Sequence, residues 1–280
     1  MIIKRKEIER LSADVRRIID GQAVDLRDNL EGRLSILKND VHTLAGRLAE
    51  QAGNLQKEKI ALANTLADIS HQLKTPLTAM MVMVELLEGA PPDKQAEFVG
   101  NIKQGLAQTN WLVNSLLKMA KLESGSIAFS PADATASELL SLALQPLRVL
   151  LDIKGQSARL SGDAAFRCDK NWTAEALTNV IKNASEHSPE GSAIEVAAGS
   201  NPITSWLAVA DAGGGMTAAE IRSAFRRFGN SRKGTGIGLP LALAIMQGQN
   251  GDIEVDGGGN GKGATFSLKF YRMREAAGSR

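Results

Sequence analysis

The chain has 280 residues, of which 43% are hydrophobic and 23% are charged, and its formal net charge is +2. This length and composition are typical of a globular chain with one or two packed domains and an extension, and the small net charge argues against a nucleic-acid partner. A single cysteine, Cys168, excludes an internal disulfide, and no run of about 18 apolar residues is present to span a membrane.

Apolar repeats predict helices in the first part of the chain. A stripe from Ile8 to Ile18 indicates a short helix that Gly21 would end. From Leu30 to Leu48, apolar residues recur at alternating spacings of four and three, which predicts a parallel two-stranded coiled coil. We therefore expect residues 1–58 to form helices that include this coiled coil. The basic residues at positions 4–6 fit either the edge of a membrane helix outside this chain or a solvated helix start.

A histidine, His71, follows in a second helical seam. Apolar residues from Leu62 to Leu73 recur at spacings of four, three and four, and His71 points roughly 200° away from them. The imidazole should therefore be exposed, and its neutral form is a good nucleophile. Thr75 lies one turn later on the same face, and Pro76 should kink the helix or loosen its hydrogen bonds.

The pattern then indicates a helical hairpin. Residues 89–92 break the first helix, and a second apolar seam runs from Phe98 to Ala120. A hairpin with one apolar seam per helix cannot bury both seams alone, whereas two copies would form an antiparallel four-helix bundle, so we expect a homodimer. Ser124, Gly125 and Ser126 are typical of a hinge.

After residue 126 the pattern predicts a mixed domain. The expected helices lie at 139–151, 172–184 and 241–246, and the expected strands at 164–168, 194–198, 207–209, 252–255 and 264–270. Helices on one face of a mixed sheet would make an α/β sandwich, with the last two strands paired.

One predicted helix carries a polar stripe. Glu175, Asn179, Asn183 and His187 are each four residues apart and share a face. Amide oxygens suit a Mg²⁺ ion that keeps most of its water and touches substrate phosphates. An ordinary solvated helix surface would give the same stripe.

Two glycine-rich segments come next. Asp211 comes directly after a strand, and Ala212 and three glycines follow it. Its carboxylate could accept a hydrogen bond from an adenine amino group, although a bare turn fits as well. Residues 234–239, Gly-Thr-Gly-Ile-Gly-Leu, open an apolar helix whose backbone amides could bind phosphate. A dinucleotide site would require a preceding strand and an acid about 20 residues on, and neither fits well.

The order of these segments resembles that of the sensor histidine kinases of bacterial two-component systems. The shared motifs are Ser70-His-Gln-Leu-Lys-Thr-Pro-Leu-Thr78, the Asn-x-x-x-Asn helix, Asp-x-Gly-x-Gly, Phe225-Arg-Arg-Phe228 and Gly-Thr-Gly-Ile-Gly-Leu, over roughly residues 60–271. The resemblance implies a dimeric four-helix bundle carrying the histidine at 59–125. It implies a C-terminal ATP-binding α/β sandwich of the gyrase, Hsp90 and histidine-kinase type at 126–272, with a tail at 273–280.

The resemblance also implies an activity. His71 would accept the γ-phosphoryl group of ATP, with Mg²⁺ as cofactor, and pass it to an aspartate in the receiver domain of a response regulator. Thr75 would help orient water when the same protein dephosphorylates that regulator. The chain would be the cytoplasmic portion of a membrane-associated sensor whose membrane segments lie outside it.

Residue by residue, the resemblance implies that Asn183 holds Mg²⁺ and that Asp211 reads adenine. The other residues expected at the nucleotide are Asn179, Lys182, His187, Gly213, Gly215, Arg226, Arg227, Gly234, Thr235, Gly236, Ile237, Gly238 and Leu239. Arg226, Arg227, Arg232 and Lys233 are the basic residues of a lid segment between Met216 and Gly234.

Two positions depart from the family pattern. Gln72 stands beside the histidine where the family often has an acid, so the proton acceptor is open. Glu186 stands where a lysine is common near phosphate, and Lys182 is the expected substitute. A nucleotide-binding scaffold without catalysis is therefore one alternative. An ATP-hydrolysing relative is another, although it would usually carry a glutamate where Asn179 stands.

Overall fold

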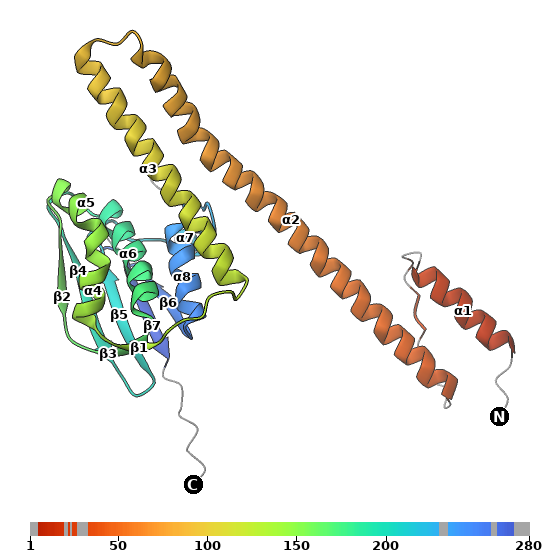
Figure 1. Ribbon diagram of the computed structural model, residues 1–280. Helices are drawn as coiled ribbons and strands as arrows, with labels where there is room; N and C mark the ends of the chain where they lie inside the picture. The colour runs from red at the N-terminus through yellow and green to blue at the C-terminus, as the bar shows by residue number, and fades with distance from the viewer. Residues whose placement is uncertain are drawn as a thin grey trace. The chain divides into compact units, whose positions relative to one another are not determined.

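The computed structural model describes residues 5–19, 22, 24–26, 33–229, 235–258 and 262–271 (Figure 1). The chain divides into two compact units, residues 1–70 and 71–280. Gly21 and Leu30, the predicted end of the first helix and the predicted start of the coiled coil, lie outside the described residues. None of the described helices is long and apolar enough to cross a membrane.

The first unit contains α1 (Arg5–Ile19) and the beginning of α2 (Arg33–Leu87). Leu11 on α1 is buried, whereas Leu37, Leu44 and Leu48 on α2 are exposed. These three leucines belong to the seam for which the sequence predicts a coiled coil. Their exposure in one chain leaves a face available to a second helix, and the coiled coil stays a prediction.

A helical hairpin opens the second unit. Helix α2 continues through Pro76 to Leu87 without a break, and α3 (Pro92–Glu123) runs back beside it. The two helices approach closely at Gly105, where a Cβ would lie 2.8 Å from the Sδ atom of Met80. The glycine gives the Met80 side chain room at this contact. The sequence predicts the hairpin but not this contact.

Helix α3 ends at a defined stop. The amide of Ser126 donates to the Lys121 carbonyl and that of Gly125 to the Leu122 carbonyl, while Gly125 has a φ of 64°. This is the Schellman arrangement, which favours glycine because the left-handed conformation carries no Cβ penalty. The predicted hinge thus lies at a helix end with its own hydrogen bonds.

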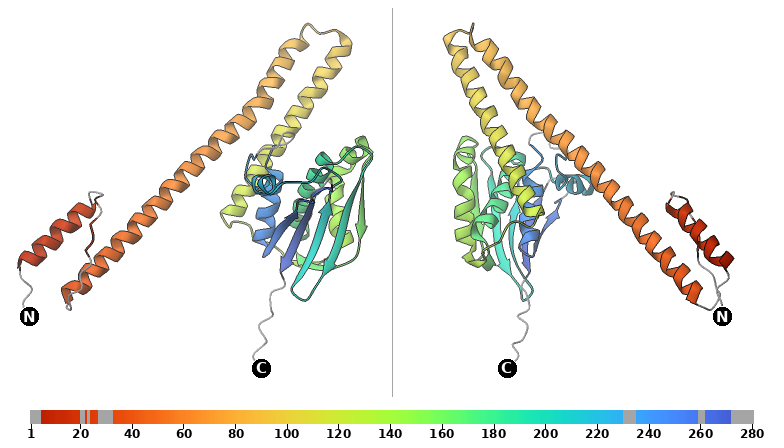
Figure 2. Two further views of the ribbon diagram at one scale, coloured as in Figure 1. Left: turned by 180° about the vertical axis from the view of Figure 1, so that it is seen from behind. Right: turned by 45° about the vertical axis from the view of Figure 1, so that its right-hand side comes forward.

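The α/β domain follows. Its elements are β1 (Ala132–Thr135), α4 (Ala136–Leu144), the 3-10 turn η1 (Gln145–Leu147), α5 (Arg148–Ile153), β2 (Ser157–Ser161), β3 (Ala165–Cys168), α6 (Lys170–His187), β4 (Ala193–Ser200), β5 (Thr204–Ala210), α7 (Ala218–Ala224), α8 (Gly238–Gly248), β6 (Gly251–Asp256) and β7 (Thr265–Tyr271). Five strands form a sheet in the order β2-β4-β5-β7-β6, and only β2 and β4 are parallel. Helices α4, α6 and α8 cover one face of it (Figure 2).

The core lies between that sheet face and the helices. Leu207 of β5 and Leu268 of β7 alternate with outward residues and are fully buried, as are Leu177 on α6 and Leu241 on α8. Complete burial of each such side chain contributes about 1.5–3 kcal/mol. The predicted α/β sandwich on a mixed sheet is confirmed.

Some elements differ from the sequence prediction. The helix expected at 139–151 is interrupted by η1, because Pro146 lacks the amide that a continuous helix needs. The short strands β1 and β2 and the helix α7 were not predicted. Helix α7 begins with a capping box, in which the side chains of Thr217 and Glu220 each accept a hydrogen bond from the other's backbone amide. The three-residue spacing of these two residues is a sequence signal for a helix start.

Candidate active site

His71 is exposed on α2, as the seam predicts. Thr75, one turn later, is also exposed, and its Oγ1 donates to the His71 carbonyl at 3.1 Å. Pro76 has no amide to offer the Gln72 carbonyl, so the backbone beside the histidine lacks one helical hydrogen bond. Leu73, on the other side of α2, packs against the core. The imidazole is thus held on a packed helix and remains open to a reactant.

A cavity of about 1080 Å³ lies over α6. Its walls come from α6, α7, the start of α8 and α3. The residues that the sequence assigns to a nucleotide site and that line this cavity are Asn179, Lys182, Asn183, His187, Gly215, Thr235, Gly236, Gly238 and Leu239. Residues that are distant along the chain therefore meet at one hollow, on the helix with the polar stripe.

The first end of α6 is fixed by side chains from two directions. Asp169 caps it by accepting from the amides of Asn171 and Trp172 at 3.1 and 3.2 Å. Gln249, just after α8, accepts from the Asp169 amide at 2.7 Å and donates to the Thr173 hydroxyl at 3.3 Å. The helix start is thereby tied to the end of α8.

The other end of α6 is closed by Gln156. Its amide nitrogen donates to the carbonyls of Ser185, Ser188 and Pro189 at 3.3, 3.2 and 2.9 Å, and its oxygen accepts from the Ser185 hydroxyl at 2.6 Å. Lys154 also donates to the Ser185 carbonyl, at 2.7 Å, so carbonyls at the end of α6 that have no partner within the helix are satisfied by side chains. The network fixes the last turn of α6, which carries Glu186 and His187.

The two asparagines of the stripe differ in environment. Asn179 is 5% exposed, and its amide nitrogen donates to the Glu175 carbonyl at 2.9 Å. A Cβ on Gly238 would lie 3.1 Å from the Asn179 side-chain oxygen, so the glycine at the start of α8 leaves room for this oxygen. Asn183 is half-buried and makes no hydrogen bond to any residue that the structure describes.

The donor set at the cavity fits Mg²⁺ held mainly by a ligand's phosphates. The amide of Asn183 is unpaired within the described part of the chain, and the Glu186 carboxylate lines the same cavity. The described residues contain no cluster of three or more His, Cys, Asp or Glu side chains that could enclose a metal. One or two oxygen ligands suit Mg²⁺, which retains water and binds substrate phosphates.

Charge at the cavity centres on Lys182. Its ammonium is 3.9 Å from the Glu186 carboxylate and 4.6 Å from the ring centre of Trp111 on α3. Burial raises the pKa of the Glu186 carboxyl, and the positive charges of Lys182, His187 and Lys154 oppose that rise. A cation and a partly buried acid thus stand side by side in the cavity wall.

Asp211 packs in the loop that follows β5. Its Oδ1 accepts from the Gly213 amide at 2.8 Å, and the next amide, of Ala212, donates to the Ser188 hydroxyl at 3.0 Å. A Cβ on Gly213 would lie 2.8 Å from the His187 carbonyl oxygen, so this loop packs tightly on the end of α6. Asp211 and Gly213 are not among the residues that line the cavity as the described residues define it.

Three other predicted site residues, Arg226, Arg227 and Ile237, do not line the cavity as the described residues define it. Arg227 forms an ion pair with Glu123 at the end of α3, and Arg226 is exposed. Ile237 is fully buried and anchors the start of α8. Gly234, Arg232 and Lys233 lie outside the described residues.

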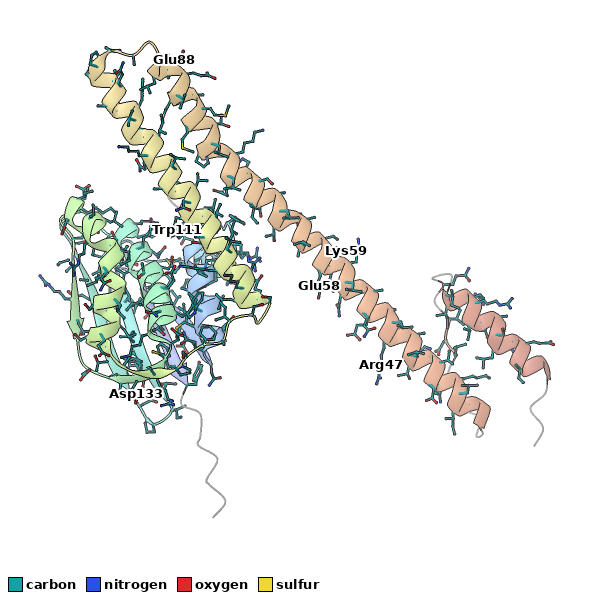
Figure 3. All side chains as sticks on the ribbon, in the orientation of Figure 1. Arg47, Glu58, Lys59, Glu88, Trp111 and Asp133 are labelled. Atoms are coloured by element: carbon teal, nitrogen blue, oxygen red, sulfur yellow. The ribbon has the colours of Figure 1, made fainter. Side chains whose placement is uncertain are left out.

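Sequence reasoning missed the contribution of α3. Gln104, Ala107, Gln108 and Trp111 line the cavity, and Trp111 lies on the stretch of α3 beside the α/β domain (Figure 3). Lys118 on α3 pairs with Glu175 at 2.8 Å, which turns that member of the stripe toward α3. The sequence signal that could have indicated this contribution is Trp111, a large apolar residue that does not belong to the apolar seam predicted from Phe98 to Ala120.

Two family models match separate parts of the chain. The His Kinase A (phospho-acceptor) domain model matches residues 61–125, and the histidine kinase-, DNA gyrase B- and HSP90-like ATPase model matches residues 168–273. The signal transduction histidine-protein kinase BaeS of Escherichia coli is 24% identical over 221 residues, which are 78% of this chain and 47% of BaeS.

A second curated relative is the signal transduction histidine-protein kinase/phosphatase MprB of a Mycobacterium species. It is 30% identical over 180 residues, which are 59% of this chain and 33% of MprB. The chain spans about half or less of the length of these relatives. The histidine kinase ThkA, solved in complex with the response regulator protein TrrA, shares the fold with a TM-score of 0.65 at 15% identity, over 81% of this chain and 67% of ThkA.

Proposed function

Because this chain belongs to the sensor histidine kinases, we propose that it binds ATP in the cavity over α6, transfers the γ-phosphoryl group to His71 and passes it to an aspartate of a response regulator. One observation carries the proposal most directly. An exposed histidine followed by Thr75 and Pro76 lies in the phosphoacceptor match, and the cavity lined by Asn179 and Asn183 lies in the ATPase match.

The residues present supply what phosphoryl transfer requires. This reaction depends mainly on positioning and on stabilising charge at the phosphates. Asn183 would hold Mg²⁺, which would neutralise phosphate charge when bound. Lys182 would add a cation, and the exposed imidazole of His71 would be the nucleophile. Gln72 has no basic group, so it would not remove the proton, and the proton acceptor stays open.

We also propose the arrangement of the chain in the active protein. Residues 59–125 would dimerise and carry the phosphoacceptor, residues 126–272 would bind ATP, and residues 1–58 would transmit a signal to them. Exposed apolar residues on the hairpin, such as Leu77 and Leu106, support a second copy as their cover. The reaction would take place in the cytoplasm, where ATP and a response regulator are available.

The proposed partner and reverse reaction have more indirect support. A relative of the same fold, ThkA, was solved with a response regulator protein, and MprB carries the name of a kinase/phosphatase. We propose that a receiver domain binds beside His71 and that Thr75 orients water for its dephosphorylation. Replacing Thr75 by Ala should slow loss of label from a phosphorylated receiver domain and leave labelling of His71 intact.

The decisive test uses ATP labelled at its γ-phosphate. The whole chain incubated with this ATP and Mg²⁺ should acquire label that is lost in acid and survives base. His71→Gln should abolish the labelling. His42→Gln is the matched control, because His42 lies on the same helix outside the phosphoacceptor match, and this variant should label normally.

The same experiment separates the alternatives. Free labelled phosphate without labelled protein would identify an ATP-hydrolysing protein. Nucleotide binding without either product would identify a signalling scaffold. Label retained by His71→Gln would place the phosphoacceptor elsewhere and overturn the proposal.

A further inference from the structure

Trp111 connects the phosphoacceptor hairpin to the cavity. Its ring centre lies 4.6 Å from the Lys182 ammonium, and both residues line the cavity although one is on α3 and the other on α6. This distance is within the range of an attraction between a cation and an aromatic ring. Trp111 is itself partly buried and packs against the core that contains its neighbour Leu112, so packing holds the side chain at the cavity wall.

Lys182 has hydrogen-bonding capacity to spare. Its ammonium is 3.9 Å from the Glu186 carboxylate, well beyond the ~2.7–2.9 Å of a charge-assisted hydrogen bond. Among the residues that the structure describes, the ammonium donates no hydrogen bond. An ammonium carries three donors, so all of these remain available to a ligand in the cavity.

The Glu186 carboxylate would compete with a phosphate for the Lys182 ammonium. A lysine and a glutamate four residues apart on a helix can pair, and Glu186 is partly buried in the same wall. If the ammonium closed onto that carboxylate, an incoming phosphate would have to displace it. The ring of Trp111 provides a second attraction for the ammonium without offering a negative charge.

We propose that Trp111 is a positioning residue of the nucleotide site, and this rests on the proposed function. Its ring holds the Lys182 ammonium apart from Glu186 and available to the polyphosphate of a nucleoside di- or triphosphate. Part of the affinity for phosphate is therefore supplied by the phosphoacceptor hairpin. Binding of the nucleoside part does not require Trp111.

The test is calorimetric titration of the whole chain with adenosine, ADP and a non-hydrolysable ATP analogue, with Mg²⁺ present. The variants are Trp111→Leu, Trp111→Phe, Lys182→Met and the double variant Trp111→Leu/Lys182→Met. Trp206→Phe is the control, because this tryptophan lies on β5 at an outward position of the sheet, with its ring over Gly199. Thermal melting of every variant checks that it is folded.

Trp111→Leu should weaken ADP and the ATP analogue by about tenfold and leave adenosine unchanged. Trp111→Phe, which keeps an aromatic face, should recover part of the loss. In the Lys182→Met background, removing the ring should have no further effect on ADP, because the cation that it positions is absent. Trp206→Phe should bind all three ligands like the unmodified chain.

Three results would overturn the proposal alone. The first is an equal loss of adenosine and ADP affinity in Trp111→Leu, which would indicate a purely structural role. The second is additive losses of ADP affinity in the double variant. The third is unchanged ADP binding in Trp111→Leu. Should Trp111→Leu fail to fold, the same comparison is made with Trp111→Phe, and its unchanged ADP binding would count against the proposal. If the unmodified chain binds no nucleotide, the proposed function itself fails.

Discussion

The hairpin and the α/β domain have helices of similar amphipathic pattern, but they bury them differently. On α6 of the α/β domain, Leu177 and Ile181 are fully buried by the sheet and the neighbouring helices. On the hairpin, Leu77 is 46% exposed and Leu106 is 56% exposed. An apolar stripe shows that a helix needs a cover, but it does not show whether the same chain provides it.

Helix α3 combines both situations. One side carries Leu112 and Met119 into the core beside α8, and another side exposes Leu106 and Val113. The sequence shows one seam, yet the helix has two apolar surfaces. We interpret the first as its attachment to the α/β domain and the second as the surface that a second copy covers.

The largest difference between the two regions is expected when one apolar side chain is truncated in each. Ile181→Ala should cost about 2–5 kcal/mol in the free energy of unfolding, because it leaves a cavity in the packed core. Leu106→Ala should leave unfolding of the α/β domain within about 0.5 kcal/mol and weaken self-association instead.

Denaturant unfolding followed by tryptophan fluorescence measures the first effect, and sedimentation velocity measures the second. Equal losses of domain stability in the two variants would show that Leu106 is covered within one chain. Unchanged self-association in Leu106→Ala would remove the support that its exposure gives to the dimer.

Two adjacent glycines test how tightly the α/β domain is packed at its site. A Cβ on Gly213 would meet the His187 carbonyl and the Asp211 carboxylate at 2.8 and 2.9 Å, whereas one on Gly214 meets nothing within 4 Å. Gly213→Ala should cost about 1–3 kcal/mol and weaken nucleotide binding, because the loop must shift. Gly214→Ala should change neither property, and a comparable loss in both variants would contradict this packing.

A smaller difference is expected between threonines of the two regions. Thr135 accepts from the Glu138 amide in a capping box at the start of α4, whereas Thr65 in α2 donates to the Ala61 carbonyl of its own helix. Thr135→Ala should cost about 1 kcal/mol by thermal melting. Thr65→Ala should change stability by less than about 0.5 kcal/mol, because alanine is the better helix former. A larger loss at Thr65 would reverse this ranking.

The smallest effect should be a pH dependence. Burial raises the pKa of Glu186 above its usual 4.5, so the folded protein holds this proton to a higher pH than the unfolded chain. Its contribution to stability is complete below pH 4.5 and is lost as the pH rises through the folded pKa. Glu186→Gln should therefore gain melting temperature relative to the unmodified chain between pH 4 and about pH 7.

Glu88→Gln is the control from the hairpin, where Glu88 lies exposed at the end of α2 (Figure 3). Its melting temperature is compared with that of the unmodified chain over the same pH range. A gain at Glu88 equal to that at Glu186 would show that net charge, and not burial, causes the change.

Local geometry explains what the sequence could predict. The exposure of His71 follows from the position of one residue relative to the seam of its own helix, and the strands around Leu207 and Leu268 follow from alternation over a few residues. The stripe from Asn179 to His187 needed only the helical repeat. These features involve neighbours within one element.

The missed features depend on packing between distant elements. Trp111 enters the cavity because α3 packs beside α8, and no local pattern specifies that contact. Arg227 pairs with Glu123, and Asp211 does not line the cavity as the described residues define it. Strand β1 has only four residues, two of them alanines, and is defined by pairing with β3, so its own sequence carries little β-strand preference.

Both ends of α6 are closed by glutamines from elsewhere in the chain, and this has a consequence for folding kinetics. Gln156 bonds carbonyls 29 to 33 residues later, and Gln249 bonds the Asp169 amide 80 residues earlier. Contacts over such separations form only after the intervening chain has been closed into loops, which slows folding. The helix that carries the proposed nucleotide ligands should therefore become stable late and together with α8, so a nascent chain would acquire its nucleotide site only after residue 249 has emerged.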